Sequence, residues 1–239
     1  MVLARERGDA RLERLARLCR ESGVPVSMEP RDQLTRLART DAHQGALALV
    51  RERNFLTLED LLAEPHAGSQ KRFFLALDGI EDPHNLGALL RTADGAGVDG
   101  VLMPERRSAP VSGTVAKASA GASEHVRIAR VTNLVRSLEQ MKKANIWVIG
   151  LDERGTPDYT DFDFNMDCVL VLGREGAGLH DLVKRTCDHL LRIPMAGKVS
   201  SLNVSVAGAV VMYEAMRQRR QPAAPKPVAP PKPRKGLGS

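Results

Sequence analysis

In the first quarter of the chain, segments with apolar residues at helical spacing alternate with short apolar segments that are typical of strands. Between residues 9 and 21 they fall at helical spacing and a Ser-Gly pair ends the pattern, which predicts a helix. Thr57 and Asp60 have the spacing of a capping box and predict a brief helix near the end of this region. Residues 1–64 are therefore expected to form a small α/β domain. Its other predicted elements are strands at residues 24–28 and 46–50 and a helix at residues 32–39.

From residue 73 the pattern changes to short apolar runs without polar alternation. Strands of this kind are buried on both faces, which is typical of a mainly parallel sheet covered by helices. Residues 72–220 are therefore expected to form a second α/β domain, joined to the first by a turn-rich linker at residues 65–71. In such sheets, ligands bind at the carboxyl ends of the strands. The predicted strands are residues 73–77, 100–103, 126–128, 146–151, 169–172 and 190–193.

A polar segment, residues 78–87, follows the first of these strands and leads into a helix. Asn85 is a candidate N-cap of that helix, and Arg91 follows six residues later. On a helix that leaves the strand ends, Arg91 is placed to reach back over a ligand site. The alternative for Arg91 is a surface arginine that forms a salt bridge.

A second segment, residues 172–179, places three glycines between a buried strand and a helix. Glycine-rich turns at this position commonly bind nucleotides. The spacing of Gly173, Gly176 and Gly178 does not fit G-x-G-x-x-G, and no Lys-Ser or Lys-Thr pair follows as in a P-loop. The segment therefore favours a cofactor with an adenosine end and no phosphate chain.

The third segment, residues 193–203, joins a glycine-bearing loop to a helix whose first turns are small. Gly197 and its small neighbours permit close contacts with the backbone. Ser201 and Asn203 are good helix-start residues, and capping could be their whole role. The alternative is that this loop closes a ligand site together with the other two segments.

In chain order, the three segments resemble the signature motifs of a known enzyme family. The motifs are N-L-G-x-x-x-R-T-A, L-G-x-E-G-x-G-L and I-P-M-x-G-x-V-x-S-L-N-V-S-V-A. They resemble those of the SpoU/TrmH family of RNA ribose 2′-O-methyltransferases, within the SPOUT superfamily. Residues 117–122 also resemble the family, and residues 40–45 resemble the small RNA-binding domain of the bacterial 23S rRNA guanosine 2′-O-methyltransferases.

The resemblance implies a fold, a cofactor and an oligomeric state. The fold is α/β, a mainly parallel sheet with a C-terminal trefoil knot, preceded by an RNA-binding domain of the ribosomal-protein L30e type. S-adenosylmethionine is expected in the knot, with RNA as substrate and a homodimer that completes each active site. Family members begin with a further strand and helix before the segment that matches residues 2–5, so the first domain is expected to be incomplete at its start.

The resemblance also implies roles for individual residues. Arg91 matches the catalytic arginine of the family. Because a guanidinium group keeps its proton at neutral pH, we expect Arg91 to orient a phosphate and to stabilise a developing alkoxide. The residues expected to fix Arg91, the ribose or the methionine end of the cofactor are Asn85, Glu175, Ser201 and Asn203. The expected cofactor residues are Gly173, Ile193 and Leu202 through backbone groups and Leu172 and Met195 at the adenine, and no metal is expected.

Charge and composition refine this expectation. The formal net charge is +6, but seven Lys or Arg residues and no acidic residue follow position 216, so the rest of the chain is nearly neutral. Residues 221–239 contain six prolines and are expected to form a disordered basic tail. Three cysteines, and no apolar run of about 18 residues, favour a reduced cytoplasmic protein without a membrane span.

Together these observations predict an S-adenosylmethionine-dependent enzyme that methylates a ribose 2′-hydroxyl in structured RNA, with a guanosine of 23S rRNA as the first expectation. Alternatives in the same class are a guanosine of tRNA and an adenosine of rRNA. A different class is a non-catalytic RNA-binding or ribosome-assembly factor. The presence of Asn85, Arg91, Glu175 and Asn203 argues against it, because a binding module does not need all four.

Overall fold

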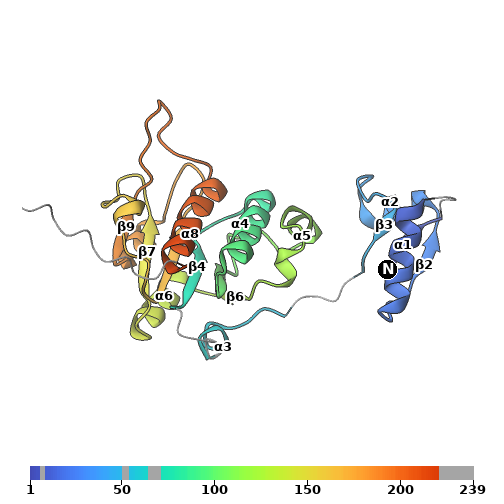
Figure 1. The fold of residues 1–239 in the computed structure, drawn as a ribbon, viewed down its shortest axis with the longest axis horizontal. Helices are drawn as coiled ribbons and strands as arrows, with labels where there is room; N and C mark the ends of the chain where they lie inside the picture. Colours follow the sequence, from blue (N-terminus) through green and yellow to red (C-terminus); the bar gives the residue numbers. More distant parts are fainter. Residues whose placement is uncertain (6–8, 50–53, 64–70, 221–239) are drawn as a thin grey trace, which may run out of the picture. The chain divides into compact units, whose positions relative to one another are not determined.

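The computed structural model describes residues 1–5, 9–49, 54–63 and 71–220, which form two compact units (Figure 1). The first unit is Met1–Asn54 and the second is Phe55–Ser239. Most of the predicted linker and the whole of the predicted tail lie outside the described residues.

The first unit is a small α/β fold, as the hydrophobic pattern predicts. Its sheet has the order β2-β1-β3, in which the central strand is parallel to β2 and antiparallel to β3. Leu3 of the central strand packs with Leu12 and Leu34 from the two helices. Both predicted helices are confirmed, whereas the two predicted strands are shorter than expected. The elements are β1 (Val2–Ala4), α1 (Ala10–Glu21), β2 (Ser27–Glu29), α2 (Arg31–Ala38) and β3 (Ala46–Leu47).

The second unit contains a six-stranded sheet in the order β6-β5-β4-β8-β7-β9, and every pairing in it is parallel. The predicted parallel sheet is confirmed, and each predicted strand overlaps an observed one. The strands are β4 (Phe73–Leu77), β5 (Gly100–Pro104), β6 (Ile128–Val131), β7 (Trp147–Leu151), β8 (Cys168–Leu172) and β9 (His189–Leu191).

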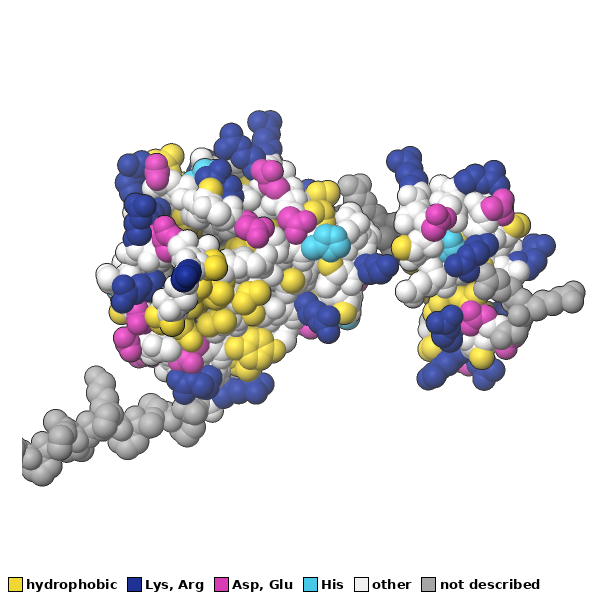
Figure 2. All heavy atoms as spheres, turned by 90° about the horizontal axis from the view of Figure 1, so that it is seen from above, with side chains coloured by type: hydrophobic (Ala, Val, Ile, Leu, Met, Phe, Trp, Pro, Cys, Tyr) yellow, Lys and Arg dark blue, Asp and Glu magenta, His cyan; other side chains and the backbone are white. Residues whose placement is uncertain are grey.

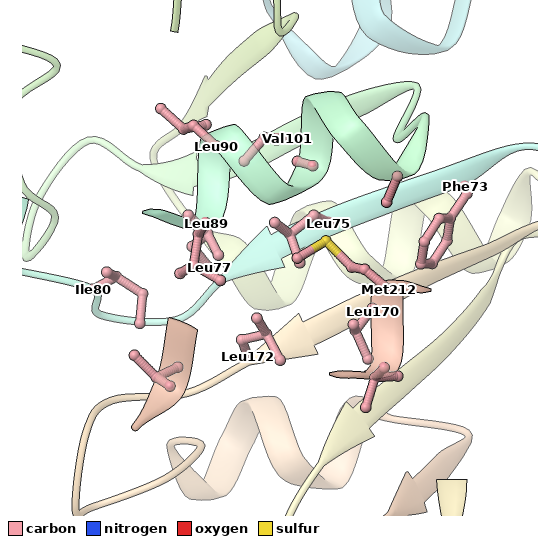
Figure 3. Close-up of a cluster of buried hydrophobic side chains, with 14 of the residues drawn as sticks. Phe73, Leu75, Leu77, Ile80, Leu89, Leu90, Val101, Leu170, Leu172 and Met212 are labelled. Carbon is pink, nitrogen blue, oxygen red and sulfur yellow. The ribbon is translucent and has the colours of Figure 1, made fainter. Parts of the chain in front are cut away.

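Helices cover both faces of this sheet because successive side chains of each buried strand point to opposite sides. Phe73, Leu75 and Leu77 of β4 pack toward the helices of one layer, as Figure 3 shows. Phe74 and Ala76 pack toward the other layer. The first layer contains α4 (Pro83–Ala96), α5 (Gly113–Ala118) and α8 (Val204–Arg220), the second α3 (Leu58–Ala63), α6 (Leu134–Lys143) and α7 (Asp181–Thr186), and two short 3-10 helices are η1 (Ala122–Glu124) and η2 (Tyr159–Asp161).

The boundary between the units differs from the expected one. Residues 55–63 were expected in the first domain, but they pack with the second unit. Leu56 forms a parallel bridge with Ala129, and Leu58 and Leu61 are buried in the core of the second unit. The predicted capping box at the start of α3 is confirmed, because Asp60 N–H donates to Thr57 Oγ1 (3.1 Å) and Thr57 N–H donates to Asp60 Oδ2 (3.2 Å).

The last helix, α8, is fastened at its far end by Arg219. This guanidinium donates to the carbonyls of Lys71 (2.7 Å) and Met166 (2.7 Å) and lies 4.7 Å from the ring centroid of Phe73. These contacts are at the amino ends of β4 and β8, so the first turn of α8 lies at the carboxyl edge of the sheet. The predicted trefoil knot stays a prediction. None of the described helices is long and apolar enough to cross a membrane.

Candidate active site

The three predicted site segments meet at the carboxyl edge of the six-stranded sheet. Leu77 at the end of β4 is in register with Leu172 at the end of β8, and Leu151 at the end of β7 is in register with Leu191 of β9. The segment after β4 leads into α4, the segment after β8 into α7, and the segment after β9 into α8. The fold therefore brings together loops that are far apart in the sequence.

Three polar side chains, one from each segment, form a connected cluster, here called the polar cluster. Asn85 Nδ2 donates to Glu175 Oε2 at 3.1 Å. Asn203 Nδ2 donates to Asn85 Oδ1 at 3.0 Å and to Glu175 Oε1 at 3.3 Å. The carboxylate of Glu175 thus accepts from both amides, and each of the three side chains contacts the other two.

Asn85 is not the N-cap of α4. That position belongs to Asp82, whose Oδ2 accepts from the backbone N–H of Asn85 at 2.8 Å. Pro83 follows at the first helical position, where the missing N–H has no cost. Because Asp82 caps the helix, the Asn85 side chain is available to the polar cluster.

Asn203 caps α8 and also joins the polar cluster. Its Oδ1 accepts from the backbone N–H of Ser205 (2.9 Å) and of Val206 (3.4 Å), which satisfies free N–H groups at the start of α8. Its Nδ2 faces the other way, into the polar cluster. The cap therefore fixes the orientation of the amide that joins the cluster.

A cavity lies beside the polar cluster, with an empty volume of about 930 Å³ counted out to the solvent at its mouth. Glu175 of the polar cluster and Ser201 both line this first cavity. All five residues expected to hold the cofactor also line it, namely Leu172, Gly173, Ile193, Met195 and Leu202. A second cavity adjoins the cluster on the side of α4, and Asn85, Arg174 and Glu175 line it.

The wall formed by residues 173–179, here called the glycine loop, is tightly folded. Arg174 and Gly178 exchange backbone hydrogen bonds of 3.0 and 2.9 Å, so the chain doubles back between them. A Cβ atom on Gly173 would lie 2.2 Å from the carbonyl carbon of Gly178. Gly178 itself has φ +67°, a conformation that favours glycine. Position 173 therefore requires glycine, because the loop packs against its own backbone there, and Gly173 also lines the first cavity.

The first cavity also has an acidic side that the sequence analysis did not identify. Asp152 and Glu153, which follow β7, both line it. Burial alone would raise the pKa of Asp152, but hydrogen bonds from Lys184 Nζ and the Arg154 N–H outweigh it and lower the pKa. Asp152 is therefore a carboxylate at neutral pH. Asp152 directly follows a predicted buried strand, and this position could have identified it from the sequence as a residue of the ligand site.

The lining fits S-adenosylmethionine. Apolar side chains from Leu172, Ile193 and Leu202 suit an adenine ring, and carboxylates suit its sulfonium and ammonium groups. When bound, this molecule supplies an electrophilic methyl group. Among the described residues, no group of three or more His, Cys, Asp or Glu side chains is placed to hold a metal ion.

Arg91 is the one predicted site residue that the structure places apart from the rest. It is exposed on α4 and lines neither of the two cavities. The helix turns about 100° per residue, so six residues carry Arg91 to a different side of α4 from Asn85. Within one chain, Arg91 therefore does not reach back over the first cavity.

Comparison with known proteins identifies the family. The model of the SpoU rRNA methylase family matches residues 72–213. The chain belongs to this SpoU family. A second model, for RNA 2′-O ribose methyltransferase substrate binding, matches residues 1–56. The SpoU chain is accordingly an RNA methyltransferase that uses S-adenosylmethionine, with its RNA-binding domain at the N-terminus.

Similar proteins agree with this assignment. YacO of Bacillus subtilis (strain 168), whose name places it in the TrmH family of tRNA/rRNA methyltransferases, is 45% identical over 87% of this chain and 83% of its own length. The SpoU methyltransferase AviRb from Streptomyces viridochromogenes, solved with S-adenosylmethionine, has a TM-score of 0.74 at 26% identity over 91% of this chain and 81% of that one. An S-adenosylmethionine-bound rRNA methyltransferase from Sinorhizobium meliloti has a TM-score of 0.72 at 27% identity over 90% and 79% of the two chains.

Proposed function

We propose that this SpoU chain methylates a ribose 2′-hydroxyl of structured RNA, and that the target is a guanosine of 23S rRNA. The observation that carries the proposal is the polar cluster, which stands between two cavities. The ribose assignment is supported by the substrate-binding model, whose description names RNA 2′-O ribose methyltransferases. The rRNA assignment is supported by the SpoU rRNA methylase description and by the motif at residues 40–45.

In this proposal, each of the two cavities binds one of the two reactants. The first cavity, with its glycine loop and apolar lining, holds the methyl donor, and the second holds the ribose. The reaction forms a bond between the ribose oxygen and the methyl carbon and breaks the bond from that carbon to sulfur, so the donor leaves as a neutral thioether and the hydroxyl proton passes to solvent. Such a displacement depends mainly on alignment. The role of Asn85, Glu175 and Asn203 is to hold the ribose and the donor in line.

Arg91 lies outside both cavities of its own chain, so its proposed role is in a homodimer that completes each active site. There its fixed positive charge, supplied to the site of the other copy, orients an RNA phosphate and stabilises the developing alkoxide. Arg91→Ala is expected to leave S-adenosylmethionine affinity almost unchanged, because the residue lies outside the first cavity. Methyl transfer should fall by about a hundredfold or more. Calorimetric titration and a radiolabelled methyl-transfer assay on the same preparation measure the two quantities. Near-full transfer by the variant would remove Arg91 from the mechanism.

We further propose that two copies of the chain form the active enzyme, with the exposed side of α8 as the contact surface. Val206 and Tyr213 on this helix are 49% and 47% exposed. Figure 2 shows hydrophobic side chains gathered on one face of the larger unit. Such a surface favours a symmetric dimer. Sedimentation should give a dimer for the wild type and a monomer for Val206→Asp, whereas a monomeric wild type would contradict the proposal.

The target is tested by mapping ribose methylation in total RNA from cells with and without the gene. Loss of one signal at a 23S rRNA guanosine supports the proposal. A lost signal in tRNA, or at an rRNA adenosine, would show that the enzyme methylates a ribose of a different target nucleotide. Unchanged RNA together with no uptake of S-adenosylmethionine would instead indicate a non-catalytic RNA-binding factor.

A further inference from the structure

Asp78, the first residue after β4, is bonded to both ends of the glycine loop. Its backbone N–H donates to the carbonyl of Leu172 at 2.8 Å, directly before the loop. Its carboxylate accepts from the backbone N–H of His180 at 2.7 Å and from His180 Nδ1 at 2.8 Å, directly after the loop. One residue therefore closes the loop at its base.

Asp78 is buried, with 5% of its surface exposed, and it is not among the residues that line either cavity. It has no access to a ligand and can act only through the residues that it holds. The loop that it closes carries Gly173 and Glu175, which line the first cavity. The chain also packs closely here, since a Cβ atom on Gly79 would lie 2.8 Å from Arg174 Cγ.

We infer that Asp78 is a positioning residue for S-adenosylmethionine, holding the glycine loop in the conformation that binds the donor. The inference rests on the use of this donor and adds a residue outside the binding surface. If the loop samples other conformations when its base is open, the apparent dissociation constant rises in inverse proportion to the fraction of molecules that keep the binding conformation. The affinity for the donor is therefore the quantity that Asp78 controls.

The same two strands offer a matched control at their opposite ends. Asp167, just before β8, accepts from the backbone N–H of Arg72 at 3.0 Å and from Arg72 Nε at 2.9 Å. Like that of Asp78, its carboxylate accepts one backbone and one side-chain hydrogen bond from a single residue. It lies at the amino edge of the sheet, away from both cavities. Its replacement removes a similar structural bridge without touching the loop.

The experiment measures S-adenosylmethionine binding by calorimetry and thermal unfolding for Asp78→Asn, His180→Ala and Asp167→Asn in the full chain. All three are expected to lower the unfolding temperature by a few degrees. Asp78→Asn should weaken binding about tenfold or more, because the Asn amide cannot accept both bonds. His180→Ala, which leaves the backbone bond, should weaken binding less, and Asp167→Asn should not change it.

Equal affinities for Asp78→Asn and Asp167→Asn would overturn the inference, since Asp78 would then be structural only. The inference would also be overturned if Asp78→Asn and His180→Ala both bound S-adenosylmethionine as tightly as the wild type. This failure is distinct from that of the proposed function. The proposed function fails when the wild type binds the donor but methylates no ribose.

Discussion

At the scale of single residues, the site depends on side chains that do two things at once. Asn203 caps α8 with its oxygen and joins the polar cluster with its nitrogen. Glu175 accepts from two amides and lines both cavities. Because each side chain has a structural partner, the hydrogen bonds within the protein already fix the polar cluster, and such preorganisation is what the catalytic role proposed for it requires.

The two functions of Asn203 can be separated by substitution. Asn203→Asp keeps a capping oxygen and adds a negative charge at a helix N-terminus, so the unfolding free energy should stay within about 1 kcal/mol of wild type. It loses the two donated hydrogen bonds and faces Glu175 with a like charge, so kcat should fall about a hundredfold. Urea unfolding and a methyl-transfer assay measure both effects. An Asp variant with wild-type kcat would show that Asn203 is a helix cap and nothing more.

At the scale of elements, the sequence predicted the strands and the meeting of the three loops, but not the individual helix cap and hydrogen bonds that hold the loops. Uninterrupted apolar runs located all six strands of the large sheet, because buried parallel strands have no polar alternation. The capping residue of α4 was missed, although Pro83 at the first helical position marks Asp82 as the cap. The bond between Asp78 and His180 joins residues 102 positions apart, and no local pattern encodes it.

The glycine loop gives an element-scale prediction. An alanine Cβ at position 173 would overlap backbone atoms, 2.2 Å from the Gly178 carbonyl carbon and 2.3 Å from the Leu179 nitrogen, so the loop must shift. We expect Gly173→Ala to weaken S-adenosylmethionine binding at least about tenfold. Gly197→Ala is the control, because a Cβ there meets no atom within 4 Å. Calorimetry measures the affinity of both variants for S-adenosylmethionine. Unchanged affinity of Gly173→Ala would show that binding of the donor does not depend on the conformation of this loop.

At the scale of the whole molecule, charge pairs link distant parts of the second unit. Asp167 pairs with Arg72, Asp152 with Lys184, and these contacts join strands to the helices and segments around them. Burial would raise the pKa of both carboxyl groups, but hydrogen bonds from their partners outweigh it and lower the pKa. For Glu214, the hydrogen bond from Arg217 is the largest influence and also lowers the pKa.

These lowered pKa values predict a loss of stability in acid. A carboxyl group with a lower pKa in the folded state stabilises the fold above its unfolded pKa of about 4, and that contribution disappears as the pH falls through the folded value. The unfolding free energy should therefore decrease below about pH 4.5. Urea titrations between pH 7 and pH 3 measure it, and Asp167→Asn should show a shallower decrease than wild type. Equal slopes would mean that the Arg72 pair does not stabilise the fold.

Ribose methylation by this chain is tested most directly by mass spectrometry of the nucleosides in RNA that the purified chain has treated with S-adenosylmethionine. The substrate is 23S rRNA from cells that lack the gene. We expect a single new 2′-O-methylguanosine from the wild type, formed about a hundredfold more slowly by Asn203→Asp and by Arg91→Ala. A methyl group on a base, or no new methylated nucleoside at all, would contradict it.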